Sequence, residues 1–240
     1  MFERHNVDNN PLLGRFLSAF PEQFLRRLVQ RQKPLYAQSI AISFSESWSR
    51  IESFSVLPGI RRALWENEIR QAAIECGLKS LDTPHAGENC SCVTVNSEGL
   101  ALTVHYVDGP NQFVREAESR KQNAGVNDWL NYYTDERLLT SPIPKIGGRP
   151  IYLNLLHGAA FPTLTSENLL IDDTSYFLKL AIPASGAGRY LYNWSAQELL
   201  QVYKTAPPAV SVKAELEDQA RPRRKTGDRK EKKKGEGNAG

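Results

Sequence analysis

Hydrophobic and polar positions first repeat with a helical period close to the N-terminus. In the segment Pro21–Gln32 the positions that share this spacing are all apolar: Phe24, Leu25, Leu28 and Val29. Proline and glutamate at its start suit a first helical turn. The pattern predicts an amphipathic helix that ends at Pro34, because proline lacks the N–H that a helix interior needs. The opposite face is basic and carries Arg26, Arg27 and Arg31.

The spacing of apolar residues changes after this helix. From Ser39 to Ser49, apolar residues alternate with serine or alanine, and a period of two predicts a half-buried strand. The spacing of Phe44, Trp48 and Ile51 also fits a helix, which leaves the end of this element open. Pro58 and Gly59 then interrupt the pattern. The segment Ile60–Cys76 has one apolar side at helical spacing, and Gly77 follows it as a C-cap, so we expect a long helix there.

The second half of the chain gives a clear hairpin signal. Residues 80–89 are polar and predict a loop, and 91–96 and 100–107 then alternate on both sides of a Ser-Glu-Gly turn. Beyond the hairpin, the sequence predicts two helices, two strands and a last helix capped by Ser195. These elements span Phe113–Gln122, Asn127–Leu139, Ile151–His157, Ser175–Ile182 and Ala196–Tyr203.

The order of these elements predicts the fold class. Strands that cluster in hairpins, without regular alternation with helices, are typical of an α+β fold with a mixed or antiparallel sheet and flanking helices. We expect a basic amphipathic helical region over residues 1–34, an α+β globular domain over 35–205, and a disordered, Pro-containing linker and basic tail over 206–240.

Charge is distributed unevenly along the chain. The segment Arg221–Gly240 has three acidic residues and nine basic ones, which are Arg221, Arg223, Arg224, Lys225, Arg229, Lys230, Lys232, Lys233 and Lys234. Its net charge is therefore +6 in a chain whose net charge is +3, and everything before Arg221 sums to −3. A flexible basic segment binds polyanions such as nucleic acid through its charge alone. It lacks the aromatic side chains that stack on bases, so it can add affinity without specificity. A lysine-rich tail that only aids solubility is the alternative.

Several classes of function lack their sequence signature. No segment has the roughly 20 apolar residues of a membrane span, and we expect a cytoplasmic protein with no transmembrane segment. No glycine-rich phosphate loop is present, so we expect no nucleotide cofactor. Cys90 and Cys92 have the spacing of paired ligands on a strand, but no second pair completes a zinc site, and we expect no bound metal.

The strongest enzymatic pattern follows the hairpin. An acid near the strand end and a charged segment after it provide residues of the type used by metal-dependent nucleases, namely Asp108, Glu116, Glu118 and Lys121. The glutamate and lysine lie three apart in a predicted helix, whereas nucleases of the restriction type place Glu-x-Lys on a strand. A solvated helix face explains the pattern better.

The sequence therefore favours a protein that works by binding and is not an enzyme. In the leading hypothesis, the folded body contacts a protein partner as a regulatory or accessory protein, and the basic tail adds nonspecific affinity for nucleic acid. A metal-dependent nuclease is the first alternative. The second is a membrane-surface or partner-docking protein that uses Arg26, Arg27 and Arg31.

Overall fold

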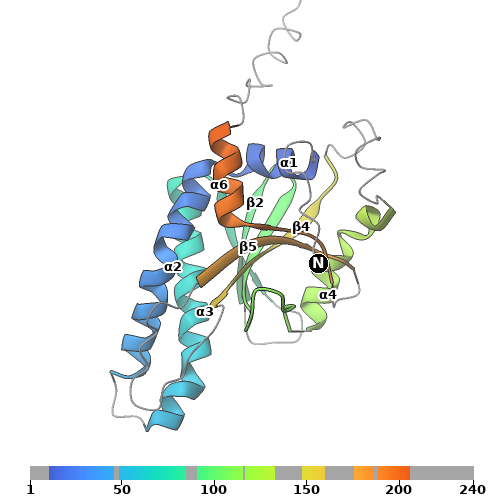
Figure 1. Cartoon of the computed structure of the whole chain (residues 1–240). Helices are drawn as coiled ribbons and strands as arrows, with labels where there is room; N and C mark the ends of the chain where they lie inside the picture. Colours follow the sequence, from blue (N-terminus) through green and yellow to red (C-terminus); the bar gives the residue numbers. More distant parts are fainter. Residues whose placement is uncertain are drawn as a thin grey trace, which may run out of the picture. The chain divides into compact units, whose positions relative to one another are not determined.

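A six-stranded mixed sheet in the order β1-β2-β3-β4-β5-β6 forms the centre of the fold (Figure 1). The strands are β1 (Lys79–Pro84), β2 (Ser91–Ser97), β3 (Leu100–Tyr106), β4 (Ile151–Ala159), β5 (Tyr176–Pro183) and β6 (Tyr190–Ser195). Neighbouring strands are antiparallel except for β3 and β4, which are parallel. The sheet thus consists of two three-stranded antiparallel meanders joined by one parallel pair.

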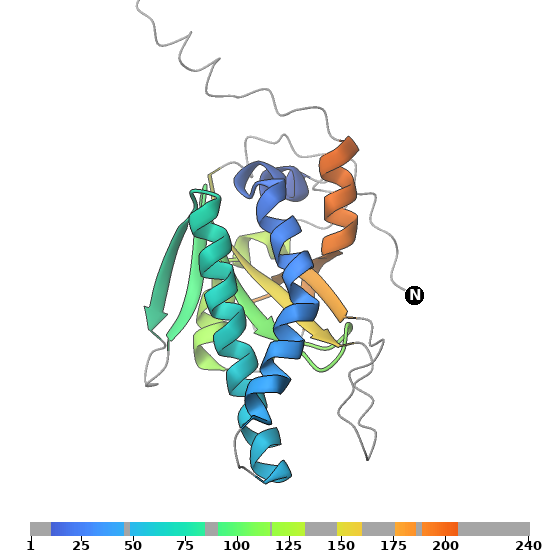
Figure 2. The same cartoon turned by 90° about the vertical axis from the view of Figure 1, so that its left-hand side faces the viewer.

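Helices cover one face of this sheet and part of the other. The helical elements are α1 (Pro11–Ala19), α2 (Glu22–Ser43), α3 (Arg50–Glu75), α4 (Glu118–Gly125), the 3₁₀ helix η2 (Asp128–Tyr132) and α6 (Ala196–Thr205). Figure 2 shows α2 and α3 side by side in front of the sheet, and α4 lies on the other side of the sheet in Figure 1. The predicted α+β class is confirmed. None of the helices in the described ranges combines the length and apolar character of a membrane span.

The fold is that of a computed structural model, which describes residues 11–45, 49–84, 91–115, 117–132, 148–159, 176–185 and 189–205. The chain divides into two compact units, Met1–Ala206 and Pro207–Gly240. All described residues belong to the first unit. The predicted disordered tail with its nine basic residues lies outside the described residues.

The hairpin β2–β3 agrees with its prediction. Val93, Val95 and Leu102 are buried on the helical face, as the alternation indicates. Glu98 and Gly99 both have positive φ, 47° and 78°, which is the backbone that a tight two-residue hairpin turn requires. The two strands predicted after the hairpin are confirmed as β4 and β5. Ser195 caps α6 as predicted: its hydroxyl accepts a 3.1 Å hydrogen bond from Glu198 N, and the Glu198 carboxylate accepts one of 3.0 Å from Ser195 N.

The predicted end of the first helix at Pro34 is wrong, and so is the strand expected from Ser39. Helix α2 continues through Pro34 to Ser43, and Ser39 and Ser43 are fully buried while Ile42 is 39% exposed. The Ser39 and Ser43 hydroxyls donate 2.7 Å hydrogen bonds to helix carbonyls, which satisfies them in the interface with α3. Packing of this small-residue side against α3 offsets the cost of a proline inside the helix. It also buries the serines, whereas the alternation indicated that the apolar residues would be buried. Residues 46–48 lie outside the described part.

Helix α3 begins ten residues before its predicted start. Ser49 and Glu52 form a capping box, and the helix then continues through Pro58 and Gly59, where the sequence pattern predicts an interruption. The end of α3 is as predicted, because Gly77 has φ 68° and follows the C-cap. The boundary expected between residues 1–34 and 35–205 falls within α2. The predicted N-terminal helix is therefore part of α2, which packs with α3.

Three further differences concern short elements. The polar segment predicted as a loop contains β1, an edge strand whose Leu81 is 60% exposed, and β6 was not predicted. Residues 113–115 are not helical, and α4 includes the residues expected to separate two helices. Only the 3₁₀ turn η2 occurs in the described part of the second predicted helix, and residues 133–139 lie outside that part. Edge strands and short helices depend on their neighbours more than on their own periodicity.

Candidate functional site

The carboxyl ends of the two parallel strands, β3 and β4, lie side by side at the same end of the sheet. His105 pairs with Leu156 and Tyr106 with His157. At this end, β2 pairs with β3 only as far as Thr94 and Thr103, although both strands continue beyond that point. The two strands separate there, and a cavity of about 320 Å³ opens between them, α3 and the segment that follows β3. Volumes of this size are typical of small-ligand sites.

Cationic side chains dominate the lining of this larger cavity. Its charged residues are Arg61, Arg62, Arg115, Arg120, Glu66 and Asp108. Glu66 accepts a 2.9 Å hydrogen bond from Arg62 one helical turn away, so one of the two carboxylates is paired within α3. Four arginines against two carboxylates leave an excess of two positive charges. Such an excess in a partly enclosed space attracts anions.

A second, smaller cavity of about 40 Å³ adjoins the larger one. Val114, Arg115 and Arg120 line both cavities, and the smaller one adds Lys121 and Arg189. No carboxylate is among the described residues that line it. Because they share these three residues, we refer to the two cavities together as the cleft from here on.

A buried aromatic cluster forms the inner wall of the cleft. His157 stacks on Trp65 with ring centroids 4.4 Å apart, and its Nδ1 lies 3.0 Å from the Tyr36 hydroxyl. His157 is fully buried, and this burial, with lesser contributions from the charges of His105 and Arg61, lowers its pKa well below the usual value. The imidazole is thus neutral at pH 7 and adds no positive charge to the cleft.

Arg61 is held in position at this wall. Its guanidinium carbon lies 4.8 Å from the ring centroid of Tyr36 and 5.9 Å from that of Tyr106. Its Nε donates a 3.3 Å hydrogen bond to Ser39 of α2. This bond uses one of five guanidinium N–H groups, so the two terminal nitrogens keep donors for a ligand.

Two buried polar atoms in the described part of the chain have no hydrogen-bond partner, and each belongs to a residue that lines the cleft. They are Nε1 of Trp65, at the larger cavity, and Oδ1 of Asn154, at the smaller one. Trp65 is 1% exposed and Asn154 is 4% exposed. An unsatisfied buried polar group is costly, which indicates that each atom meets a water or a ligand.

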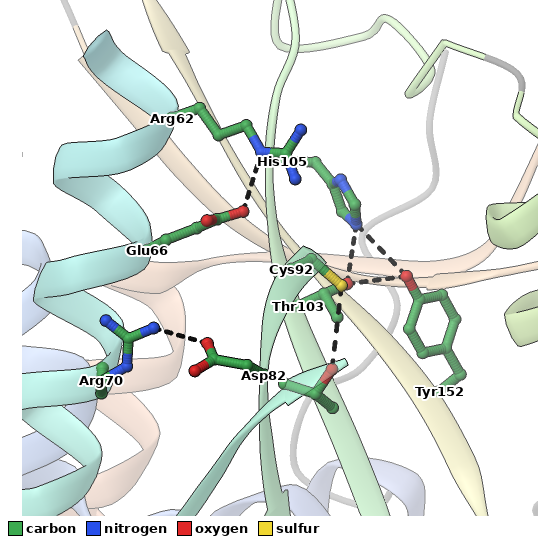
Figure 3. A network of polar contacts seen from close by, with 9 residues as sticks. Arg62, Glu66, Arg70, Asp82, Cys92, Thr103, His105 and Tyr152 are labelled. Atoms are coloured by element: carbon green, nitrogen blue, oxygen red, sulfur yellow. Dashed lines mark hydrogen bonds and ion pairs between the residues drawn. The ribbon is translucent and has the colours of Figure 1, made fainter. Parts of the chain in front are cut away.

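A polar cluster on the sheet supports the cleft from the side of β3 and β4. Thr103 Oγ1 lies 2.7 Å from both His105 Nε2 and the Tyr152 hydroxyl, and Figure 3 shows these groups turned toward one another, with Arg62 and Glu66 on α3. Burial raises the pKa of Tyr152, and hydrogen bonds with Thr103 and Asn123 oppose that shift. These contacts hold His105 Nε2 and thereby orient the imidazole ring.

The residues of the predicted nuclease are only partly brought together. Asp108 lines the larger cavity, where burial and then the Asp108 charge raise the pKa of Tyr106. Lys121 lines the smaller cavity, Glu118 is exposed on the first turn of α4, and Glu116 lies outside the described residues. No group of three His, Cys, Asp or Glu side chains among the residues with described positions is placed to hold a metal ion. Cys90 lies outside that set. The nuclease stays a prediction.

The predicted partner-binding arginines on α2 contact carboxylates of the same helical pair. Arg26 pairs with Glu22, Arg27 with Glu68 and Glu75, and Arg31 with Glu68. Glu75 and then Glu68, through hydrogen bonds, raise the pKa of Arg27. Docking of a partner or membrane by these arginines stays a prediction, as does polyanion binding by the tail, which lies outside the described residues.

Apart from Asp108 and Lys121, the residues that build the cleft are not among those that the sequence pattern selects. Arg61 and Trp65 are about one turn apart on α3, whereas Arg115 and Arg120 follow β3, so no local spacing connects the two pairs. Within the chain, only the closeness of these arginines to exposed aromatic residues such as Tyr106 and Phe113 is a signal, and it is a weak one. No protein-family model, curated protein or solved structure matches this chain.

Proposed function

We propose that this protein works by binding, and that its cleft receives anionic groups of a nucleic acid while the tail Arg221–Gly240 adds sequence-independent affinity. The observation that carries the proposal is the larger cavity, about 320 Å³ in volume, with four arginines against two carboxylates. Phosphate groups are the anions that basic clefts and flexible basic segments both bind.

The cleft supplies groups that the tail lacks. Tyr106 is 37% exposed beside the larger cavity, and Phe113, which lines the smaller one, is 48% exposed. Exposed aromatic rings next to cations are the combination that binds single-stranded nucleic acid, because bases stack on the rings while the cations contact phosphates. The tail contributes charge, and the folded part contributes the stacking surface.

The proposal is tested with an internally fluorescein-labelled single-stranded oligothymidine, by fluorescence anisotropy at several salt concentrations. We compare the native chain with a chain lacking residues 221–240 and with the double variant Arg115→Ala/Arg120→Ala. Log affinity falls linearly with log salt concentration, and each lost phosphate contact makes this negative slope shallower by about 0.7 for single strands. The double variant should therefore reduce the magnitude of the slope by up to about 1.4, and the truncation should reduce it by more.

A matched control removes two cations elsewhere. The double variant Lys33→Ala/Lys204→Ala takes the same charge from exposed positions that do not line the cleft. It should bind nearly as the native chain does. The proposal is wrong if the cleft variant and the truncated chain both keep native affinity and native salt dependence, or if the control loses as much as the cleft variant.

A further inference from the structure

We infer that the larger cavity is a site for a phosphomonoester, either the terminal phosphate of a nucleic-acid strand or the phosphate of a free mononucleotide. The inference rests on the proposed function, because it names the chemical group that the cleft receives. It is argued from the shape of the cavity, its charge and its unpartnered donor.

The inner wall of the cavity is closed. Trp65 and His157 are each 1% exposed and stack on each other against the Tyr36 hydroxyl. A strand that continues in both directions cannot pass through this wall. This wall favours the end of a chain or a small molecule as the group that reaches it.

The charge of the cavity matches a monoester better than a diester. The lining carries an excess of two positive charges, and the neutral His157 adds none. A phosphomonoester carries about −1.5 to −2 charges at pH 7, since its second pKa is about 6. A backbone phosphodiester carries one negative charge and leaves the cavity with uncompensated arginine charge.

The inner wall contains an unpartnered donor. The indole N–H of Trp65, a residue that lines the cavity, is buried without an acceptor among the described residues, and a phosphate oxygen that reaches it would satisfy it. Arg61 is held beside it by Ser39 and by the rings of Tyr36 and Tyr106, so little side-chain freedom is lost when it binds. The orphaned Asn154 oxygen needs no such ligand, because its cavity of about 40 Å³ suits a water.

The experiment uses the full chain and three otherwise identical oligothymidines that end in a 5′-phosphate, a 3′-phosphate or hydroxyls only. We expect at least one phosphorylated strand to bind about tenfold more tightly than the hydroxyl-ended strand, because the terminal phosphate adds charge-assisted hydrogen bonds that a terminal hydroxyl does not make. Competition by thymidine monophosphate, with thymidine as its control, distinguishes a free nucleotide from a strand end.

The variant Trp65→Phe removes the indole N–H and keeps an aromatic ring at the inner wall. It should lose most of the preference for the phosphorylated end, whereas Trp129→Phe, at a tryptophan whose N–H donates to Pro150 O, should keep it. If Trp65→Phe does not fold, the native chain is titrated with thymidine monophosphate and followed by the indole N–H signals of its four tryptophans. One of these signals should shift on saturation.

The outcomes separate the two proposals. Equal affinity for phosphorylated and hydroxyl-ended strands, or no indole shift at saturation, overturns the phosphomonoester site and leaves the proposed function intact. Absence of binding to any strand by the full chain overturns the proposed function. Binding of thymidine monophosphate in that case would still support the phosphomonoester site.

Discussion

The pairing of α2 with α3 yields a quantitative prediction about the basic face of the first helix. The Glu68 side chain is 6% exposed, and its two oxygens lie 2.6 Å from Arg27 Nε and 3.2 Å from Arg31 Nε. Removing one partner of a buried ion pair costs about 3–5 kcal/mol, because the remaining charge is left without compensation. In the variant Arg27→Ala, however, Arg31 still contacts Glu68, and the Arg27 side chain is 27% exposed. We therefore expect a loss of about 2 kcal/mol in the free energy of unfolding, roughly half of the range for a fully buried pair.

The matched control is Arg26→Ala, one residue away on the same helix. Arg26 pairs with Glu22 across one turn, and the two side chains are 45% and 35% exposed. Exposed pairs of this kind contribute about 0.3–0.5 kcal/mol. Urea unfolding at neutral pH measures all variants, and the free energy of unfolding comes from the midpoint and slope of each transition.

The two explanations of these arginines then differ in their results. If α2 uses its basic face only to dock a partner or membrane, Arg26→Ala and Arg27→Ala should leave the free energy of unfolding equally unchanged. A loss for Arg27→Ala no larger than that for Arg26→Ala would refute the structural role argued from Glu68.

Two other predictions concern buried polar groups at the sheet. The folded-state pKa of His157 lies well below its pKa in the unfolded chain. Below about pH 6.5, therefore, only the unfolded chain takes up this proton. As the pH falls through this range, the free energy of unfolding decreases by up to about 1.4 kcal/mol per pH unit. Urea midpoints from about pH 5 to 7.5 should show this loss in the native chain, and a slope unchanged in His157→Gln would contradict it. Asn127 is fully buried and makes hydrogen bonds of 2.8–2.9 Å with Tyr152 N, Tyr152 O and Pro183 O. The variant Asn127→Ala should therefore lower the free energy of unfolding by about 3 kcal/mol in the same assay. A decrease of less than about 1 kcal/mol would show that water replaces the amide.

Local patterns predicted those elements whose residues determine their own structure. The hairpin β2–β3 has alternation on both arms and a turn that needs positive φ at Glu98 and Gly99, and all of these signals are adjacent in sequence. The cap formed by Ser195 and Glu198 is equally local. In such segments the residue pattern and the tertiary structure favour the same conformation.

The failures arose where packing between distant segments decided the structure. Ser39 and Ser43 read as the polar side of a strand, yet they form the buried side of α2 because small residues allow close packing on α3. The cleft depends on the separation of β2 from β3 and on side chains from α3 and the segment after β3. No spacing in the sequence reports that separation. The excess of charge in the tail was visible by counting, whereas the excess in the cleft exists only after folding.

The parallel pair β3–β4 also bears on how quickly the chain can fold. Each meander is assembled from antiparallel neighbours that follow one another in sequence, whereas Leu100 pairs with Ile151 and Tyr106 with His157, roughly fifty positions apart. Closing such a loop costs conformational entropy before its contacts form, and pairings of this kind slow folding. We therefore expect the meeting of the two meanders to limit the folding rate, and the cleft, which needs the ends of both β3 and β4, to be completed only after it.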